Sequence, residues 1–217
     1  ILGCQFDVRG TAIYTYSAFE MLISGNKFHS NGFPYCLNPW RTTCWIYNNL
    51  FTGSVSYEVV PAWEGWSKIA FCHNTCVIET PGHVFGNRGC ASCPWWNSIS
   101  HNIFVFTGKG SALYNKPGPM ECDNNLFFVE SGRIGREGMK YHTSLASWSK
   151  AMSGYAKRGA HDANSIVGNP RFRGTWDYHL TPSSPAVGTA SPTVGVGLPW
   201  EQVTRDFDGM LRGSAKD

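Results

Sequence analysis

Residues 97–106, with the sequence NSISHNIFVF, carry a pattern that returns four more times along the chain. With Asn102 as position zero, the equivalent asparagines are spaced by 23, 25, 28 and 23 residues, and the series is Asn26, Asn49, Asn74, Asn102 and Asn125. An apolar residue lies three places before each asparagine, as Ile99 does, and another lies two places after it, as Phe104 does. Repeats of about 20 to 50 residues are typical of solenoids and propellers, in which each unit buries its apolar face against its neighbours.

Each half of the unit alternates apolar and polar residues with the period of two that a strand requires. The apolar positions three places before and two places after the asparagine are five residues apart, an odd number, which breaks this alternation. The chain must therefore turn a corner at the asparagine. Asparagine tolerates left-handed backbone, and its amide can bond to the asparagine one turn away. We therefore predict an asparagine ladder, with left-handed backbone at the asparagines, between parallel strands about 4.8 Å apart. The preceding residues are predicted to point inward as a second ladder: Gly25, Asn48, His73, His101 and Asn124.

Short apolar segments supply a third strand for each turn: Ala12-Ile13-Tyr14, Val59-Val60, Val84-Phe85 and Ala112-Leu113-Tyr114. The predicted fold is all-β, a right-handed parallel β-helix with three-strand turns. Loops of unequal length connect the strands, and such loops are where a constant frame usually carries its recognition chemistry. The first strand begins at the first residue of the sequence, so we expect that further N-terminal turns have been removed.

Outward positions after the corner are also apolar: Leu50, Val77, Ile103, Val105, Leu126 and Phe128. A strand that is apolar on both sides is buried on both sides. The cover is expected to be the segment 143–200 or another subunit.

The chain changes character after residue 132. Residues 143–152 have a hydroxyl N-cap and apolar residues at helical spacing, which predicts one short helix. We expect one domain overall, with solenoid turns at 1–132 and a helix, a last turn and a tail at 133–217.

Several segments of this second part resemble the carboxy-terminal part of secreted bacterial right-handed parallel β-helix proteins of the pectate-lyase-like superfamily. They are the helix, the D-x-N-S…N-P-x-F pattern at 162–172, the D-Y-x-L…S-P-A-V pattern at 177–187 and the D-x-D-G-x-x-R pattern at 206–212. The resemblance implies an extracellular protein that binds or cleaves polysaccharide, commonly an acidic one. The superfamily also includes adhesins and tail spikes, so the alternative is a non-catalytic structural or adhesive protein that self-associates by subunit stacking, for example into a fibre.

Composition restricts the class of partner. The net charge of +3 on 217 residues is small, and no Lys/Arg cluster provides the electrostatic footprint of a nucleic-acid-binding protein. No apolar run is long enough to span a membrane. The eight cysteines predict an oxidising compartment and disulfides, with 105 pairings open, although Cys44, Cys76 and Cys122 fit equally well as small core residues.

Candidate catalytic residues depend on the reaction. A lyase needs a cation beside the substrate carboxylate and a base for the α-proton, for which the sequence offers Lys68, Arg88 and Arg133. A hydrolase needs two carboxylates, and Glu121 and Asp123 would lie about 6.6 Å apart along one strand. Calcium stays open as a cofactor but has no clear site, because no aspartates recur at one position of the turn and the usual Asp of the N-x-D-P step is Asn169 here.

Four loop tryptophans are candidates for stacking on sugar rings: Trp63, Trp66, Trp95 and Trp96. The alternative, that they lie flat against the coil, has equal weight. His73 and His101 hold equivalent positions but lack further metal ligands in register, so we interpret them as structural. Cys90 and Cys93 have C-x-x-C spacing and are assigned to a disulfide.

Overall fold

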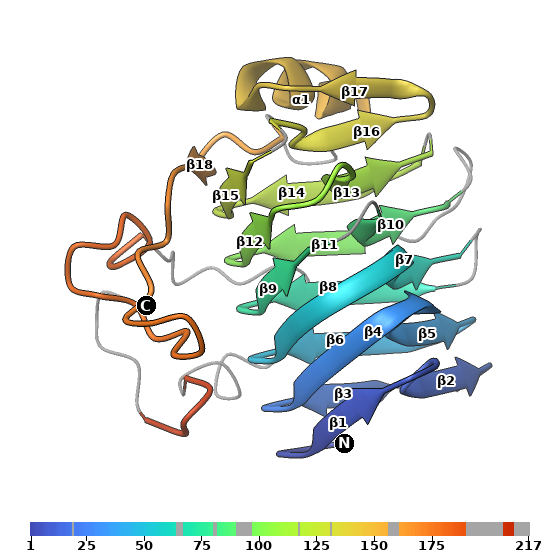
Figure 1. Cartoon of the computed structure of the whole chain (residues 1–217). Coiled ribbons are helices and arrows are strands. Elements are labelled where there is room, and N and C mark those ends of the chain that lie inside the picture. Colours follow the sequence, from blue (N-terminus) through green and yellow to red (C-terminus); the bar gives the residue numbers. More distant parts are fainter. Residues whose placement is uncertain are drawn as a thin grey trace.

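The chain winds into a parallel β-solenoid of about five turns (Figure 1), which confirms the predicted fold class. The computed structural model describes residues 1–18, 20–63, 67–79, 82–89, 97–116, 118–130, 132–155, 161–189 and 206–210. Within these residues, no helix has the length and hydropathy that crossing a membrane requires.

The strand that precedes each ladder asparagine belongs to the first face of the solenoid. This five-stranded sheet consists of β3 (Met21–Ser24), β6 (Thr43–Tyr47), β8 (Lys68–Cys72), β11 (Asn97–Ser100) and β14 (Met120–Asp123). Neighbouring strands are parallel, and equivalent residues of successive turns are opposite each other, as Ile46 is to Phe71.

The second face follows the asparagine corner. Its strands are β1 (Gln5–Val8), β4 (Lys27–Tyr35), β7 (Leu50–Ala62), β9 (Thr75–Ile78), β12 (Ile103–Phe106), β15 (Leu126–Val129) and β18 (Ile166–Val167). The long strand β7 pairs with β9 near its start and with β10 near its end, so it continues from the second face into the third.

The third face contains the predicted third strands. They are β2 (Ile13–Tyr16), β5 (Leu37–Trp40), the end of β7, β10 (His83–Asn87), β13 (Ser111–Asn115), β16 (Gly135–Glu137) and β17 (Lys140–His142). Only the last pair among the described strands, β16 and β17, is antiparallel.

Phenylalanines from successive turns stack inside the coil. Phe28 and Phe51 have ring centroids 4.9 Å apart, and Phe104 and Phe127 have centroids 5.4 Å apart. All four side chains are fully buried, which stabilises the fold by about 1.5 to 3 kcal/mol for each ring.

The asparagine ladder forms as predicted. The Nδ2 of each asparagine donates to the Oδ1 of the next, at 3.0 Å from Asn26 to Asn49, 3.0 Å from Asn49 to Asn74, 3.2 Å from Asn74 to Asn102 and 3.0 Å from Asn102 to Asn125. Each Oδ1 also accepts the backbone N–H of the preceding asparagine. The ladder therefore satisfies buried backbone groups at the corner of every turn.

The prediction that these asparagines have left-handed backbone was wrong. The positive φ belongs to the residue before each one: 64° at Gly25, 53° at Asn48, 52° at His73, 58° at His101 and 55° at Asn124. A left-handed residue reverses the strand alternation, so these side chains do not enter the core. Four of them line a pocket on the outside of the coil instead, where the rings of His73 and His101 stack 4.9 Å apart.

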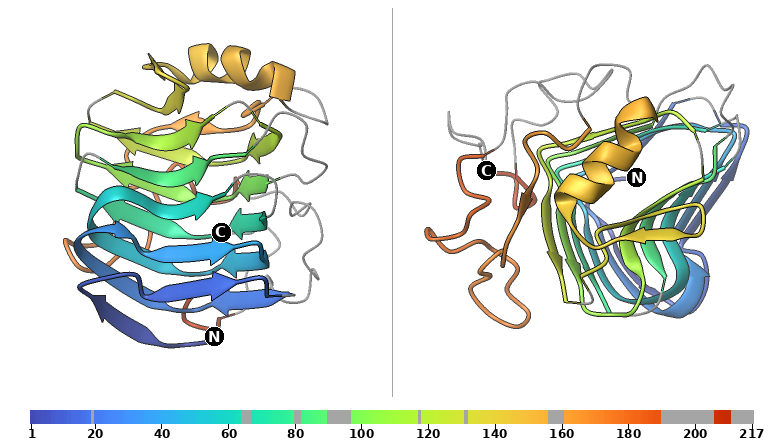
Figure 2. Two further views of the ribbon diagram at one scale, coloured as in Figure 1. Left: turned by 90° about the vertical axis from the view of Figure 1, so that its right-hand side faces the viewer. Right: turned by 90° about the horizontal axis from the view of Figure 1, so that it is seen from above.

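Helix α1 (Leu145–Met152) caps the open end of the coil, followed by the 3-10 turn η1 (Ser153–Tyr155) (Figure 2). The N-cap Ser144 accepts a hydrogen bond from the N–H of Ser147, as the hydroxyl signal predicts. Trp148 and Met152 point into the core and are fully buried. A Cβ on Gly135 would lie 2.2 Å from the Trp148 ring, so only glycine lets β16 approach the helix this closely.

The C-terminal segments lie along the second face, on the side where that face meets the asparagine corner (Figure 2). Residues of this tail, including Leu180 and Val187, face Leu50, Ile103 and Leu126 across a pocket. The tail thus lies opposite Leu50, Ile103 and Leu126 of the apolar set, while the helix closes the end of the coil.

The cysteines do not form the predicted disulfides in the described part of the chain. All six described cysteines carry thiols, and five of them are buried. Burial raises the pKa of the Cys44 thiol to about 12. The alternative prediction for Cys44, Cys76 and Cys122, that they are small core residues, is the correct one. Cys90 and Cys93 lie outside the described residues.

Candidate functional site

Aromatic and arginine side chains form a continuous stripe along the third face. We call this set the aromatic-arginine stripe, and its members are Tyr16, Tyr35, Trp40, Arg41, Tyr57, Trp63, Arg88, Tyr114, Arg133, Arg136 and Tyr141. The parallel register aligns them, since it places Tyr16 opposite Trp40 and Tyr114 opposite Arg136.

Contacts run without interruption through the first half of the stripe. The Tyr16 ring lies 6.0 Å from the Trp40 ring, and Trp40 stacks on Trp63 with centroids 5.7 Å apart. Trp63 lies 5.0 Å from the guanidinium carbon of Arg88. The indole N–H of Trp63 donates to Asn38 Oδ1 at 2.7 Å, which fixes the orientation of this ring.

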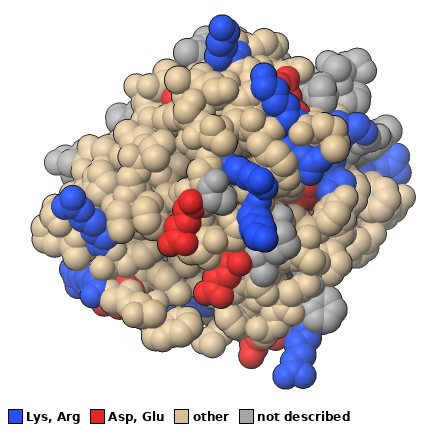
Figure 3. Space-filling model, turned by 45° about the horizontal axis from the view of Figure 1, so that its top comes forward, with Lys and Arg blue, Asp and Glu red and all other residues tan. Residues whose placement is uncertain are grey.

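In the second half of the stripe, arginine side chains and tyrosine rings alternate. The guanidinium carbon of Arg88 lies 5.8 Å from the Tyr114 ring, and that of Arg136 lies 5.4 Å from the same ring. Arg136 also lies 5.3 Å from the Tyr141 ring, and Arg133 lies 4.3 Å from it. Figure 3, which turns the helix-capped end of the coil forward, shows several basic side chains on the visible face, with acidic side chains among them. The stripe therefore presents both flat apolar rings and positive charge.

A buried ion pair holds the centre of the stripe. The Nε of Arg88 donates to both carboxylate oxygens of Glu58, at 3.0 and 2.9 Å, and a terminal nitrogen lies 2.8 Å from Oε1. The Glu58 side chain is 0% exposed and that of Arg88 is 18% exposed. A Cβ on Gly86 would lie 2.2 Å from the Glu58 carboxyl group, so the missing side chain makes room for it.

The electrostatics of this pair keep the guanidinium in place. Burial raises the pKa of Glu58, and the hydrogen bond and charge of Arg88 oppose that effect. Burial disfavours the charged form of Arg88, but Glu58 outweighs it and the pKa of Arg88 rises above its ordinary value. With Tyr57 at 4.4 Å, Arg88 is a preorganised, planar cation among aromatic rings.

His83 lies beside this pair. Its ring stacks on Tyr114 with centroids 5.2 Å apart, and its Nδ1 lies 2.8 Å from Ser111 Oγ. Burial lowers the pKa of His83 to about 4. The imidazole is therefore neutral at pH 7, and it can donate one hydrogen bond and accept another without adding charge to the stripe.

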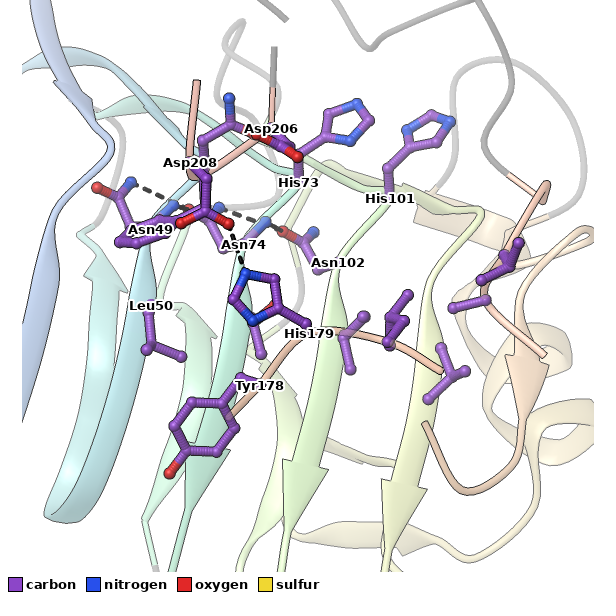
Figure 4. A pocket seen from close by; sticks show the side chains of 18 of the residues that line it. Asn49, Leu50, His73, Asn74, His101, Asn102, Tyr178, His179, Asp206 and Asp208 are labelled. Atoms are coloured by element: carbon purple, nitrogen blue, oxygen red, sulfur yellow. Dashed lines mark hydrogen bonds and ion pairs between the residues drawn. The ribbon is translucent and has the colours of Figure 1, made fainter. Parts of the chain in front are cut away.

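A separate cavity of about 450 Å³ lies between the tail and the asparagine corner (Figure 4). His73 and His101 line it from the coil side, and Tyr178, His179 and Asp208 line it from the tail side. The Nε2 of His179 lies 2.5 Å from Asp208 Oδ2.

Two carboxylates act on His179. Its Nδ1 contacts Asp177 Oδ1, and the hydrogen bonds from the ring to Asp177 and Asp208 raise the pKa of His179 above its ordinary value. This bridge ties residues 177–179 to residues 206–210. The cavity wall thus includes a clasp between two parts of the tail, and Lys27 of β4, whose Nζ lies 5.3 Å from the Phe207 ring, contacts it from the coil.

The structure brings three of the predicted site residues together, because Trp63, Arg88 and Arg133 all belong to the aromatic-arginine stripe. Lys68 is the first residue of β8 on the first face and is not a member of that stripe. Trp66, Trp95 and Trp96 lie outside the described residues.

Glu121 and Asp123 lie on β14 of the first face, as expected for one strand. The Asp123 carboxylate accepts hydrogen bonds from the backbone N–H and the side-chain amide of Asn164, at 2.7 and 2.8 Å. Asp123 therefore anchors the segment that follows the helix. The hydrolase role of the pair stays a prediction.

Sequence reasoning missed four residues of this site: Tyr57, Glu58, Tyr114 and Tyr141. Tyr114 had a signal, because it follows two inward residues of a predicted third strand. Glu58 and Arg88 are 30 residues apart, and no local pattern connects them.

Comparison of the chain with protein-family models, with curated proteins and with solved structures gives no match.

Proposed function

We propose that the third face binds an extended, acidic polysaccharide along the aromatic-arginine stripe. The observation that carries this proposal is the unbroken series of ring and guanidinium contacts from Tyr16 to Arg133. We further propose an extracellular setting, in keeping with the resemblance to secreted β-helix proteins.

The rings supply flat apolar surfaces at the solvent boundary. Tyr16 is 58% exposed, Tyr57 47%, Trp40 39% and Tyr141 37%. Exposed aromatic side chains offer a large contact area at a low cost in conformational entropy and keep a polar edge for hydrogen bonds. A sugar ring presents a face of C–H groups and a rim of hydroxyl groups, and it complements such a surface.

The guanidinium groups favour acidic units in the glycan. Arginine binds carboxylates and sulfates through paired N–H groups in one plane. Arg88 is already oriented by Glu58, and Arg136 by a hydrogen bond of 2.8 Å from its Nε to the carbonyl of Gly138. Little side-chain entropy is then lost when an anion binds.

Binding can be measured by affinity electrophoresis and calorimetry with polygalacturonate, alginate, a sulfated glycosaminoglycan and an uncharged glucan. We expect the acidic glycans to bind and the glucan to bind weakly or not at all. Tyr57→Ala and Arg136→Gln should each weaken binding about five- to thirtyfold, corresponding to about 1 to 2 kcal/mol.

Matched controls come from the tail. Trp176 is 79% exposed and Arg173 is also exposed, and both lie away from the third face. Trp176→Ala and Arg173→Gln should leave the affinity unchanged. Equal losses in the tail variants and the stripe variants, or equal binding of charged and uncharged glycans, would contradict the proposal.

A further inference from the structure

Three potential metal ligands meet beneath the cap of the solenoid. Cys122 of β14 and the neighbouring residues His161 and Asp162 each offer one ligand atom, and these atoms lie within 4.8 Å of one another. All three side chains are buried, with exposures of 4%, 1% and 3%. The aromatic-arginine stripe does not use this group, and the asparagine ladder meets it only at its end, where Asn125 Nδ2 donates to Cys122 Sγ at 3.2 Å.

His161 has no aligned hydrogen bond for either ring nitrogen within the described part of the chain. The ring edge nevertheless points at the carboxylate, because Nδ1 lies 2.7 Å from Asp162 Oδ2. The other ring nitrogen, Nε2, has no partner among the described residues, and a buried polar atom without a hydrogen bond is costly to keep in the protein interior. Coordination of a metal ion would satisfy one of these nitrogens.

Neighbouring donors orient the carboxylate. The indole Nε1 of Trp148 donates to Asp162 Oδ2 at 2.9 Å, and Ser165 Oγ donates to Oδ1 at 2.6 Å. Such outer hydrogen bonds hold metal-binding carboxylates in place in metalloproteins. They also connect the group to α1 and to the end of the asparagine ladder, since Ser165 Oγ accepts the N–H of Asn125 at 2.9 Å.

We propose that Cys122, His161 and Asp162 form a binding site for Zn²⁺ that fastens the helical cap to the last turn of the coil. A thiolate, an imidazole and a carboxylate are the donor types that zinc takes, and together they supply three of the four ligands of a tetrahedral zinc ion. When zinc binds, the S–H bond of Cys122 breaks, a Zn–S bond forms and the proton passes to solvent. The two charges of the ion then balance the thiolate and the carboxylate, so the buried site is neutral.

The test uses the full chain, stripped of metal with a chelator and titrated with Zn²⁺. We expect one zinc per chain, release of at least one proton for each zinc bound, and a rise in Tm of about 5 to 10 °C when zinc is present at 100 times its Kd. Titration with Co²⁺ should produce the near-ultraviolet charge-transfer band of a thiolate-cobalt bond.

Variants separate this site from the other cysteines. Cys122→Ala and His161→Gln should abolish the zinc-dependent rise in Tm, and Cys122→Ala should remove the cobalt band. Cys44→Ala is the matched control, because Cys44 is equally buried on β6 of the same face, and it should retain both signals. The double variant Cys90→Ala/Cys93→Ala tests the C-x-x-C pair and should also retain both.

Zinc and cobalt binding to the wild-type protein tests the proposal even if the variants Cys122→Ala and His161→Gln do not fold. Absence of one-to-one zinc binding, or absence of the thiolate-cobalt band, overturns the proposal. So does loss of the band in the Cys90/Cys93 variant, because the metal would then be bound by the C-x-x-C pair.

Discussion

Replacement of Asn102 by leucine should destabilise the protein through the hydrogen bonds of the asparagine ladder. The Asn102 amide donates to the Phe71 carbonyl at 2.9 Å and to Asn125 Oδ1 at 3.0 Å. Its Oδ1 accepts the backbone N–H of Asn74 at 2.9 Å and the Nδ2 of Asn74 at 3.2 Å. Leucine removes all four bonds from a site that is 1% exposed.

The size of the effect follows from which groups lose their partner. Asn74 Nδ2 still donates to the Ile46 carbonyl, and Asn125 Oδ1 still accepts the backbone N–H of residue 102. The Asn74 N–H and the Phe71 carbonyl each lose the bond to Asn102, at about 1 to 3 kcal/mol for each buried group. Burial of the apolar leucine offsets about 1 to 2 kcal/mol. The free energy of unfolding should therefore fall by about 1 to 4 kcal/mol.

Guanidinium denaturation followed by circular dichroism measures this change. Asn31→Leu is the control, since Asn31 is exposed and makes one hydrogen bond of 3.2 Å to Asp7, and its effect should stay within about 0.5 kcal/mol. Asn102→Asp keeps an acceptor for the Asn74 N–H but turns a carboxylate toward the Phe71 carbonyl. Asn102→Asp should therefore lower the free energy of unfolding more than Asn102→Leu does at pH 7, and this loss should become smaller as the pH falls. Equal effects of Asn102→Leu and Asn31→Leu would refute the energetic role of the ladder.

Three other predictions concern the cap, the tail and activity. Gly135→Ala should destabilise the protein by about 1 to 3 kcal/mol, because the new Cβ would overlap the Trp148 ring, while Gly154→Ala, where a Cβ meets open space, should have little effect in the same denaturation assay. The pKa of His179 in the clasp is raised, so the stability that the clasp contributes is complete below the ordinary value of 6.5 and is lost as the pH rises through the raised pKa. The protection of residues 177–189 against hydrogen exchange, relative to the intrinsic exchange rate at each pH, should fall over that range, and His179→Asn should remove this fall. If the stripe supports lyase chemistry, acidic glycans should yield an unsaturated product that absorbs in the ultraviolet. If the protein is a hydrolase instead, a reducing-sugar assay should detect product, and Glu121→Gln should lose that activity. No product in either assay, together with concentration-dependent light scattering, would favour the self-associating structural alternative.

The repeated asparagine pattern was enough to predict the solenoid and its ladder. Ile99, Asn102 and Phe104 hold fixed places within one turn, and a parallel coil converts equal places in the sequence into neighbours in space. The short helix could also be predicted, because its cap and its apolar spacing are local features.

The details of the corner needed the structure. Asparagine and the residue before it can both adopt left-handed backbone, so sequence reasoning chose the wrong one of the two. The choice follows from the ladder: Asn102 must point inward to bond with the turns on either side, so His101 takes the bend. The cysteines show the same limit, because an apolar position inside the coil and one half of a disulfide look alike in sequence.

The aromatic-arginine stripe and the group around Cys122 depended on tertiary structure alone. The turns differ in length, so Glu58 meets Arg88 and Trp63 meets Trp40 at separations that follow no fixed interval. Cys122 reaches His161 only because the chain leaves the coil, forms the cap and returns beneath it. Patterns within a turn are fixed by local backbone geometry, whereas contacts between outward side chains are fixed by the strand register, which depends on the lengths of the loops between them.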